Sequence, residues 1–178
     1  SNIILIPTNS NSINSNTNLI INNININTLV SFRLTDYDID IEIIKEYLSN
    51  PFLAIVKIIN YIHFNNENPK NMNIINSNFK DNNVKIYDYN TENELCWQLY
   101  NKNTAHELIY NKSINIMTKI LKSNSAMHII DHQIELNLIT YITDLKHDTK
   151  IKKDFIRKIS IITYNNHKIV LNNKKNPK

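Results

Sequence analysis

The chain has 178 residues, of which 42% are hydrophobic, and its net charge at pH 7 is +4. These values are sufficient for one folded domain with a buried core and a tail, and the charge permits a polyanionic partner without requiring one. Glycine is absent. This absence argues against a P-loop, a dinucleotide-binding turn, a kinase-type loop or a nucleophile elbow, because each uses glycine in a tight turn or a close backbone approach to phosphate.

The abundance of Asn, Ile and Lys is explained by A/T-rich codons, so it points to the source genome and not to a function. With glycine missing, left-handed backbone positions fall to Asn or Asp. The pair Asn82–Asn83 is the clearest sequence candidate for such a turn.

Cys96 is the only cysteine, which rules out an intramolecular disulfide and a cysteine-based zinc site formed by this chain alone. The presence of a single cysteine predicts a reducing intracellular compartment. Flanked by Leu95 and Trp97, Cys96 is expected in the core.

We see no signal peptide and no apolar run of membrane-spanning length, so no membrane partner is expected. Because the first residue is Ser, we expect the chain to be part of a longer protein.

In chain order, residues 1–17 are polar and of low complexity, which predicts a disordered linker. Residues 18–33 alternate Ile or Val with Asn or Ser, the period of a strand with one apolar face. This strand either pairs with its counterpart in another chain, giving a homo-oligomer, or completes the domain's own sheet. A single α+β domain is expected over residues 34–171, followed by a basic tail at 172–178.

The domain is expected to begin with two helices. Asp38 or Asp40 can cap the first, which ends near Leu48. Asn50 and Pro51 are typical of the N-cap and first position of the second. The apolar stripe of this second helix consists of Phe52, Ile55, Ile59 and Ile62.

A hairpin around a polar turn at residues 80–83 and a further strand at 94–100 come next. Thr104 and Glu107 match a capping box that would open the following helix. A last helical region is expected from about residue 129 to 162, with a break near 147–149. The predicted fold class is α+β, with helices packed around a small antiparallel sheet or hairpin.

The string His128-Ile-Ile-Asp-His132 is the one candidate for a metal site. Two histidines at i and i+4 share a helix face, as in zinc proteases, but the general-base Glu that follows the first histidine in such enzymes is missing here. The string also lies where a helix is expected to begin. We therefore expect no metal, no cofactor and no small-molecule substrate, and a metal-dependent hydrolase using His128 and His132 remains only an alternative.

His63 lies at the edge of an apolar helix face and is expected to be partly buried and hydrogen-bonded near the helix end. The sequence shows no partner that would make it catalytic. We therefore name no catalytic residue.

A cluster of cations at residues 150–158 is the strongest candidate for a binding surface. Such clusters make nonspecific phosphate contacts, although a solvated helix face is the simpler interpretation. The candidate nucleic-acid contacts are Lys150, Lys152, Lys153, Arg157 and Lys158. Any such binding should be weak and independent of sequence, since lysine predominates and base readout favours arginine.

Four strings carry a resemblance to a known group: NPFLAIVKIINYIHFN, NPKNMNI, NSNFKDNNVKIYD and IRKISIITYNN. They resemble the C-terminal domain of uncharacterised giant-virus (nucleocytoplasmic large DNA virus) proteins. Those proteins commonly carry an upstream zinc-finger-like module and an Asn/Ile-rich linker. The resemblance spans roughly residues 35–166. This chain shows no upstream module, and YDYNTENELCW replaces the Asp-Gly turn that is usual in the group.

The resemblance implies a location in the host cytoplasm, at a viral factory, or in the virion. Together with the residue patterns, it predicts a non-enzymatic viral accessory or interaction domain that oligomerises and associates with nucleic acid. The first alternative is a structural or scaffold component of the virion.

Overall fold

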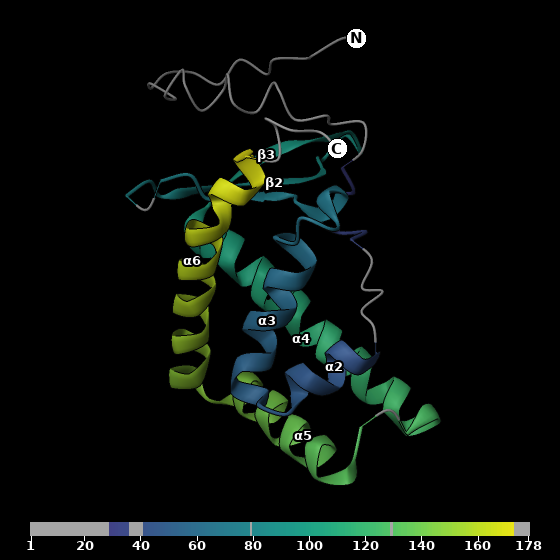
Figure 1. Ribbon diagram of the computed structural model, residues 1–178. Helices are drawn as coiled ribbons and strands as arrows, with labels where there is room; N and C mark the ends of the chain where they lie inside the picture. Colours follow the sequence, from purple (N-terminus) through teal and green to yellow (C-terminus); the bar gives the residue numbers. More distant parts are fainter. Residues whose placement is uncertain (1–28, 36–40, 79, 129, 173–178) are drawn as a thin grey trace, which may run out of the picture.

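The structure is a computed structural model that describes residues 29–35, 41–78, 80–128 and 130–172. It has the predicted α+β arrangement, in which helices pack around a small antiparallel sheet (Figure 1). The helices are α2 (Ile41–Leu48), α3 (Pro51–His63), α4 (Lys102–Met127), α5 (His132–His147) and α6 (Thr149–Asn172). A short 3-10 turn, Pro69–Asn71, precedes the sheet. No helix within the described residues has the length and apolar character needed to cross a membrane.

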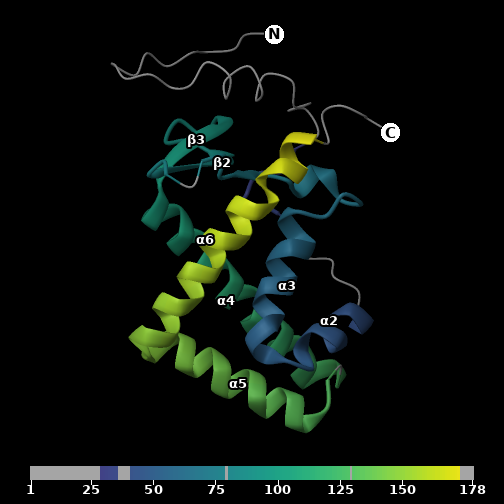
Figure 2. The same cartoon turned by 60° about the vertical axis from the view of Figure 1, so that its left-hand side comes forward.

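The sheet consists of β1 (Ile74–Ile75), β2 (Asn83–Tyr89) and β3 (Leu95–Asn101). All pairs are antiparallel in the order β1-β2-β3, so β3 is an edge strand. Tyr87 of β2 lies opposite Trp97 of β3. Figure 2 shows the sheet at one end of the molecule and α5 at the opposite end. One apolar core joins the helices to the sheet face that carries Val84 and Ile86.

The start of α3 follows the prediction. Asn50 is the N-cap and Pro51 the first helical residue, where a missing N–H costs nothing, although the Asn50 side chain makes no capping hydrogen bond. Ile55 and Ile59 are fully buried, as predicted. The predicted burial of Phe52 lies outside the described side chains. So do the two capping candidates for α2, Asp38 and Asp40.

The predicted capping box is wrong. The helix α4 begins at Lys102, and its N-cap is Asn101, whose side chain accepts a hydrogen bond from the backbone N–H of Asn103. Thr104 therefore lies inside the first turn. The physical reason is that β3 runs directly into α4, so Asn101 is both the last strand residue and the helix cap.

The predicted left-handed turn at Asn82–Asn83 is also wrong. Among the described residues, positive φ occurs at Asn93 (62°) and His128 (50°). Asn93 lies in the tight turn that joins β2 to β3, where the carbonyl of Asn90 accepts the Asn93 N–H. In the longer loop between β1 and β2, none of the described residues has positive φ.

The last helical region breaks where expected. The helix α5 ends at His147, and Asp148 accepts hydrogen bonds from the backbone N–H groups of Lys150 and Ile151, which caps α6. The helix α6 extends beyond the predicted end, to Asn172. The basic tail beyond it lies outside the described residues.

Residues 29–33, the described end of the predicted Asn/Ile strand, do not form a strand, since residues 32–34 are a turn that contacts the chain's own domain. The Val30 N–H donates to Lys70 O (2.8 Å) and the Phe32 N–H to Tyr87 O (2.7 Å). The Phe32 N–H thus reaches β2 on the side of β1, but residues 29–33 are not a strand of the sheet, which consists of β1, β2 and β3. Residues 18–28 of the same segment lie outside the described residues.

Cys96 and Trp97 were expected in the core, but both are only half-buried. The reason is the position of β3 at the edge of the sheet. Trp97 packs against the core from this edge and lies 5.5 Å from the Tyr87 ring, measured between centroids. Burial nevertheless raises the pKa of the Cys96 thiol, which makes it less reactive as a nucleophile.

Candidate functional site

A basic stripe runs along the solvent-exposed face of α6. Lys150, Lys153 and Arg157 follow one another at spacings of three and four residues, so their side chains share one side of the helix, while Lys158 is the next residue and Lys168 lies ten residues beyond it. All are exposed, in contrast to the buried Phe155 and Ile159 on the opposite side. We define the basic stripe as Lys150, Lys153, Arg157, Lys158 and Lys168.

Lys152, which the sequence placed with the other cations, does not belong to the basic stripe. Its ammonium lies 3.1 Å from the carboxylate of Glu107 on α4 and 5.1 Å from the centre of the Tyr110 ring. The side chain therefore connects α6 to α4. Lys168 is the stripe residue that the sequence interpretation missed, because the helix was expected to end near residue 162.

The positive charge on this side of α6 is concentrated between Lys150 and Lys158, where Asp154 is the only acidic residue, and Lys168 stands ten residues further along the helix. Cations in the first turns of a helix oppose its dipole, which carries partial positive charge at the N-terminus. Lys150 and Lys153 are in that unfavourable position. Asp154, four residues from both Lys150 and Lys158, is the one carboxylate of α6 placed to offset these cations at helical ion-pair spacing.

The two histidines of the metal-site alternative do not share a helix. His128 follows the last residue of α4 in a left-handed conformation, and His132 is the first residue of α5. His132 faces Glu135, with 3.8 Å between imidazole Nδ1 and carboxylate oxygen. The i and i+4 geometry that zinc proteases use is therefore not formed. Over the described ranges, no three His, Cys, Asp or Glu side chains come together as a metal site.

His63 lies in a buried polar cluster. Its Nδ1–H donates to Oδ1 of Asn73 (2.9 Å), and the Asn73 amide donates to Thr35 Oγ1 (2.6 Å) and to Val30 O (3.1 Å). The sequence predicted a partly buried His63 hydrogen-bonded to backbone near the helix end, whereas the ring is fully buried and bonds to the Asn73 side chain, a partner that the sequence did not indicate. The cluster holds residues 30–35 against the domain, so its evident role is structural.

The environment of His63 disfavours a positive charge. Burial, followed by the nearby ammonium of Lys112, lowers the pKa of His63 to about 3. Burial likewise lowers the pKa of Lys112 to about 8, although the Asp88 carboxylate opposes this shift. The Lys112 ammonium lies 4.3 Å from the centre of the Phe32 ring, which itself stacks on His63 at 5.4 Å.

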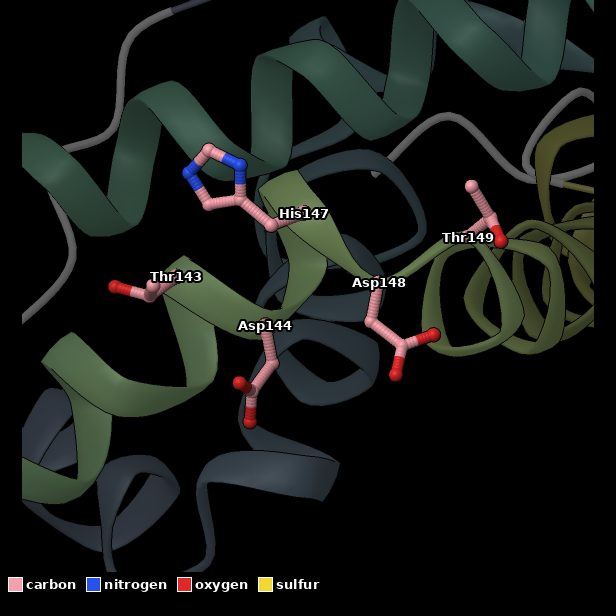
Figure 3. Close-up of a pocket in the computed structure, with 5 residues that line it drawn as sticks. All are labelled: Thr143, Asp144, His147, Asp148 and Thr149. Atoms are coloured by element: carbon pink, nitrogen blue, oxygen red, sulfur yellow. The ribbon is translucent and has the colours of Figure 1, made fainter.

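A shallow depression at the junction of α5 and α6 does not form a reaction site. Figure 3 shows its lining residues, Thr143, Asp144, His147, Asp148 and Thr149. The imidazole of His147 projects to one side of the ribbon, while the two carboxylates project to the other. Asp148 is engaged as the cap of α6. The groups do not converge on a shared point.

A second depression lies between α2 and α3, where its polar groups mainly contact one another. The Lys57 ammonium lies 3.4 Å from the Glu46 carboxylate and 5.1 Å from the centre of the Tyr47 ring. Tyr47 in turn meets Tyr61 edge to face, with 6.3 Å between the ring centroids. These contacts fasten α2 to α3.

Comparisons with protein-family models, curated proteins and solved structures gave no match to this chain. Function is therefore inferred from its own residues, and the basic stripe is the most extensive chemically uniform surface feature among those described.

Proposed function

We propose that the chain is a non-enzymatic interaction domain of a viral accessory protein, and that it associates with nucleic acid through the basic stripe on α6. The observation that carries this proposal is the set of exposed cations on one side of α6, of which Lys150 and Lys153 lie in the first turns, where the helix dipole disfavours positive charge. Such a surface neutralises phosphates and releases counterions, which gives binding that is independent of sequence.

The dimensions of the stripe suit a phosphate backbone. From Lys150 to Lys168 the helix rises about 27 Å, since each residue adds about 1.5 Å. Duplex DNA advances about 3.4 Å per base pair, so the stripe spans about eight base pairs. Lysine predominates in it, and lysine contacts phosphate as a point charge without bidentate base recognition.

The test is fluorescence anisotropy with a labelled duplex over a range of salt concentrations. If four or five stripe cations contact phosphates, log affinity should fall with log salt concentration with a slope of about −4. The double charge reversal Lys153→Glu and Arg157→Glu should make the slope shallower by about two and weaken binding strongly.

A matched control keeps the same change in net charge. Lys70 and Lys122 are also exposed but lie on the 3-10 turn and on α4, outside the basic stripe. The double variant Lys70→Glu and Lys122→Glu should lose only the small part of affinity that comes from overall charge. Equal loss in both double variants, or an affinity that does not change with salt, would show that the stripe is not the binding surface.

A further inference from the structure

A second surface lies at the outer edge of β3, with which no other described strand pairs, and which is called its free edge. The strand Leu95–Asn101 has the sequence LCWQLYN and contains no charged residue and no proline. Natural proteins commonly protect edge strands with lysine, proline or a covering element, because unpaired N–H and C=O groups attract another strand. None of the residues of β3 is buried, whereas β2 beside it is mostly buried.

The hydrogen-bond pattern identifies which backbone groups face the free edge. The Tyr87 N–H donates to Asn73 O and the Tyr87 carbonyl accepts from Phe32, so both groups point away from β3. Trp97 lies opposite Tyr87, which makes this a non-hydrogen-bonded pair. Bonding alternates along an antiparallel ladder, so Leu95, Trp97 and Leu99 direct their N–H and C=O groups to the free edge.

By strand alternation, the same three residues share the sheet face of their partners Tyr89, Tyr87 and Lys85, opposite the inward-facing Val84 and Ile86. Of the three, Trp97 also contacts the core cluster from the sheet edge. Leu95 is 41% exposed and Leu99 is 53% exposed. The edge therefore offers an unpaired ladder and an adjoining apolar surface together. An added strand would satisfy the ladder and cover the leucines in a single step.

The arrangement of these side chains is self-complementary. Leucines stand two residues before and two residues after Trp97, so the pattern is the same in both directions along the strand. In an antiparallel pair of identical strands centred on Trp97, each Leu95 lies opposite the partner's Leu99. Apolar cross-strand pairs stabilise such a ladder, and with no charge between Leu95 and Asn101 no like charges oppose each other.

We propose that β3 pairs with β3 of a second copy of this chain, centred on Trp97, and joins the two sheets across a two-fold axis. The occupant of the edge is thus another copy in an isologous contact. One strand and one small apolar patch form a small interface, so we expect dissociation at about micromolar concentrations. This surface is distinct from the basic stripe, and the proposal stands independently of nucleic-acid binding.

Sedimentation velocity of the full chain from about 5 to 200 µM tests the association, a range chosen to bracket a micromolar dissociation constant. We expect a monomer–dimer equilibrium that Leu99→Lys abolishes, because lysine on an edge strand opposes pairing. The matched control is Leu53→Lys on α3, where the leucine is 47% exposed and remote from the edge. A monomer throughout, or equal effects of the two variants, would overturn the proposal.

A disulfide trap tests the register. Centring on Trp97 places residue 98 opposite the partner's Cys96 in a non-hydrogen-bonded pair, where the Cα atoms are about 4.5 Å apart, within reach of a disulfide. Gln98→Cys should therefore give a covalent dimer on oxidation. The same change combined with Cys96→Ser should not, because two cysteines at position 98 lie too far apart. Cross-linking of Gln98→Cys both with and without Cys96→Ser, or of neither protein, would overturn the proposed register.

Discussion

At the residue scale, the most informative side chains are the two fully enclosed histidines. Burial lowers the pKa of His63 to about 3 and that of His106 to about 4. Both are therefore neutral in the folded protein at neutral pH. In the unfolded chain each regains a pKa of about 6.5, so the unfolded state binds more protons as the pH falls below that value.

Acidification should therefore destabilise the protein. The folded-state pKa values lie below the unfolded ones, so the stability is fully present above about pH 6.5 and is lost as the pH falls toward the folded pKa values. Between about pH 7.5 and 5.5, each histidine should remove about 1.4 kcal/mol from the free energy of unfolding. Urea titrations at the two pH values measure this loss, which His63→Gln should reduce by about half.

The buried Ser113, which does not titrate, provides the control for this experiment. Ser113→Ala should leave the pH dependence unchanged, even if it alters stability at both pH values. A His63→Gln protein with the same loss of stability on acidification as the parent chain would contradict a neutral, buried His63.

Asn93 carries a second residue-scale prediction. With φ at 62°, it occupies the left-handed region, which costs a residue such as alanine about 1–2 kcal/mol. Asn93→Ala should therefore lower the free energy of unfolding by about 1 kcal/mol, while Asn93→Gly should not lower it. Asn82→Ala, at the position that the sequence favoured, should change it by less than about 0.5 kcal/mol. Thermal or urea unfolding of the three variants distinguishes the two turns.

At the scale of elements, the features predictable from sequence are the local ones. Helix α3 could be predicted because Asn50, Pro51 and an apolar stripe coincide within one short segment. The start of α4 could not, because Asn101 serves as its cap only where β3 leads directly into the helix. Nothing local in LCWQLYN distinguishes an edge strand from a central one, since that depends on which strands pair.

The candidate site likewise has one part that local sequence predicts and another that depends on tertiary contacts. Helical spacing groups Lys150, Lys153 and Arg157 from sequence alone. The removal of Lys152 from the stripe depends on Glu107, which lies far away in the sequence and comes close only when α4 packs on α6. Contacts of this kind follow from tertiary structure and leave no local pattern.

Burial along α3 gives a prediction at the element scale. Ile59 is 1% exposed in the centre of the core, whereas Leu53 on the same helix is 47% exposed. Ile59→Ala should lower the free energy of unfolding by about 2–5 kcal/mol, because it removes buried methyl groups and leaves a cavity. Leu53→Ala should change it by less than about 0.5 kcal/mol. Similar losses in the two variants, measured by urea unfolding, would mean that α3 does not bury this face.

At the scale of the whole molecule, the two proposed surfaces lie on opposite sides of the sheet. The helix α6 packs beside β1, and the free edge belongs to β3. Pairing of β3 with its copy would therefore place the two α6 helices at the outer ends of one joined six-stranded sheet. With about 4.8 Å between neighbouring strands, the two β1 strands would be about 24 Å apart.

This geometry predicts that the dimer binds long duplexes better than short ones. A duplex of about 8 base pairs, about 27 Å long, has the length of a single basic stripe, whereas one of about 30 base pairs can reach both stripes of a dimer. The second contact is then intramolecular, so affinity for the long duplex should rise at least tenfold above that for the short one. Leu99→Lys should abolish this gain without changing affinity for the short duplex, because it removes dimerisation and leaves each stripe intact.

Anisotropy titrations of both duplexes, with Leu53→Lys as the control, measure the effect. A gain that persists in Leu99→Lys would show that the length dependence does not arise from pairing through β3, while a loss of short-duplex binding in that variant would place β3 itself in the nucleic-acid contact.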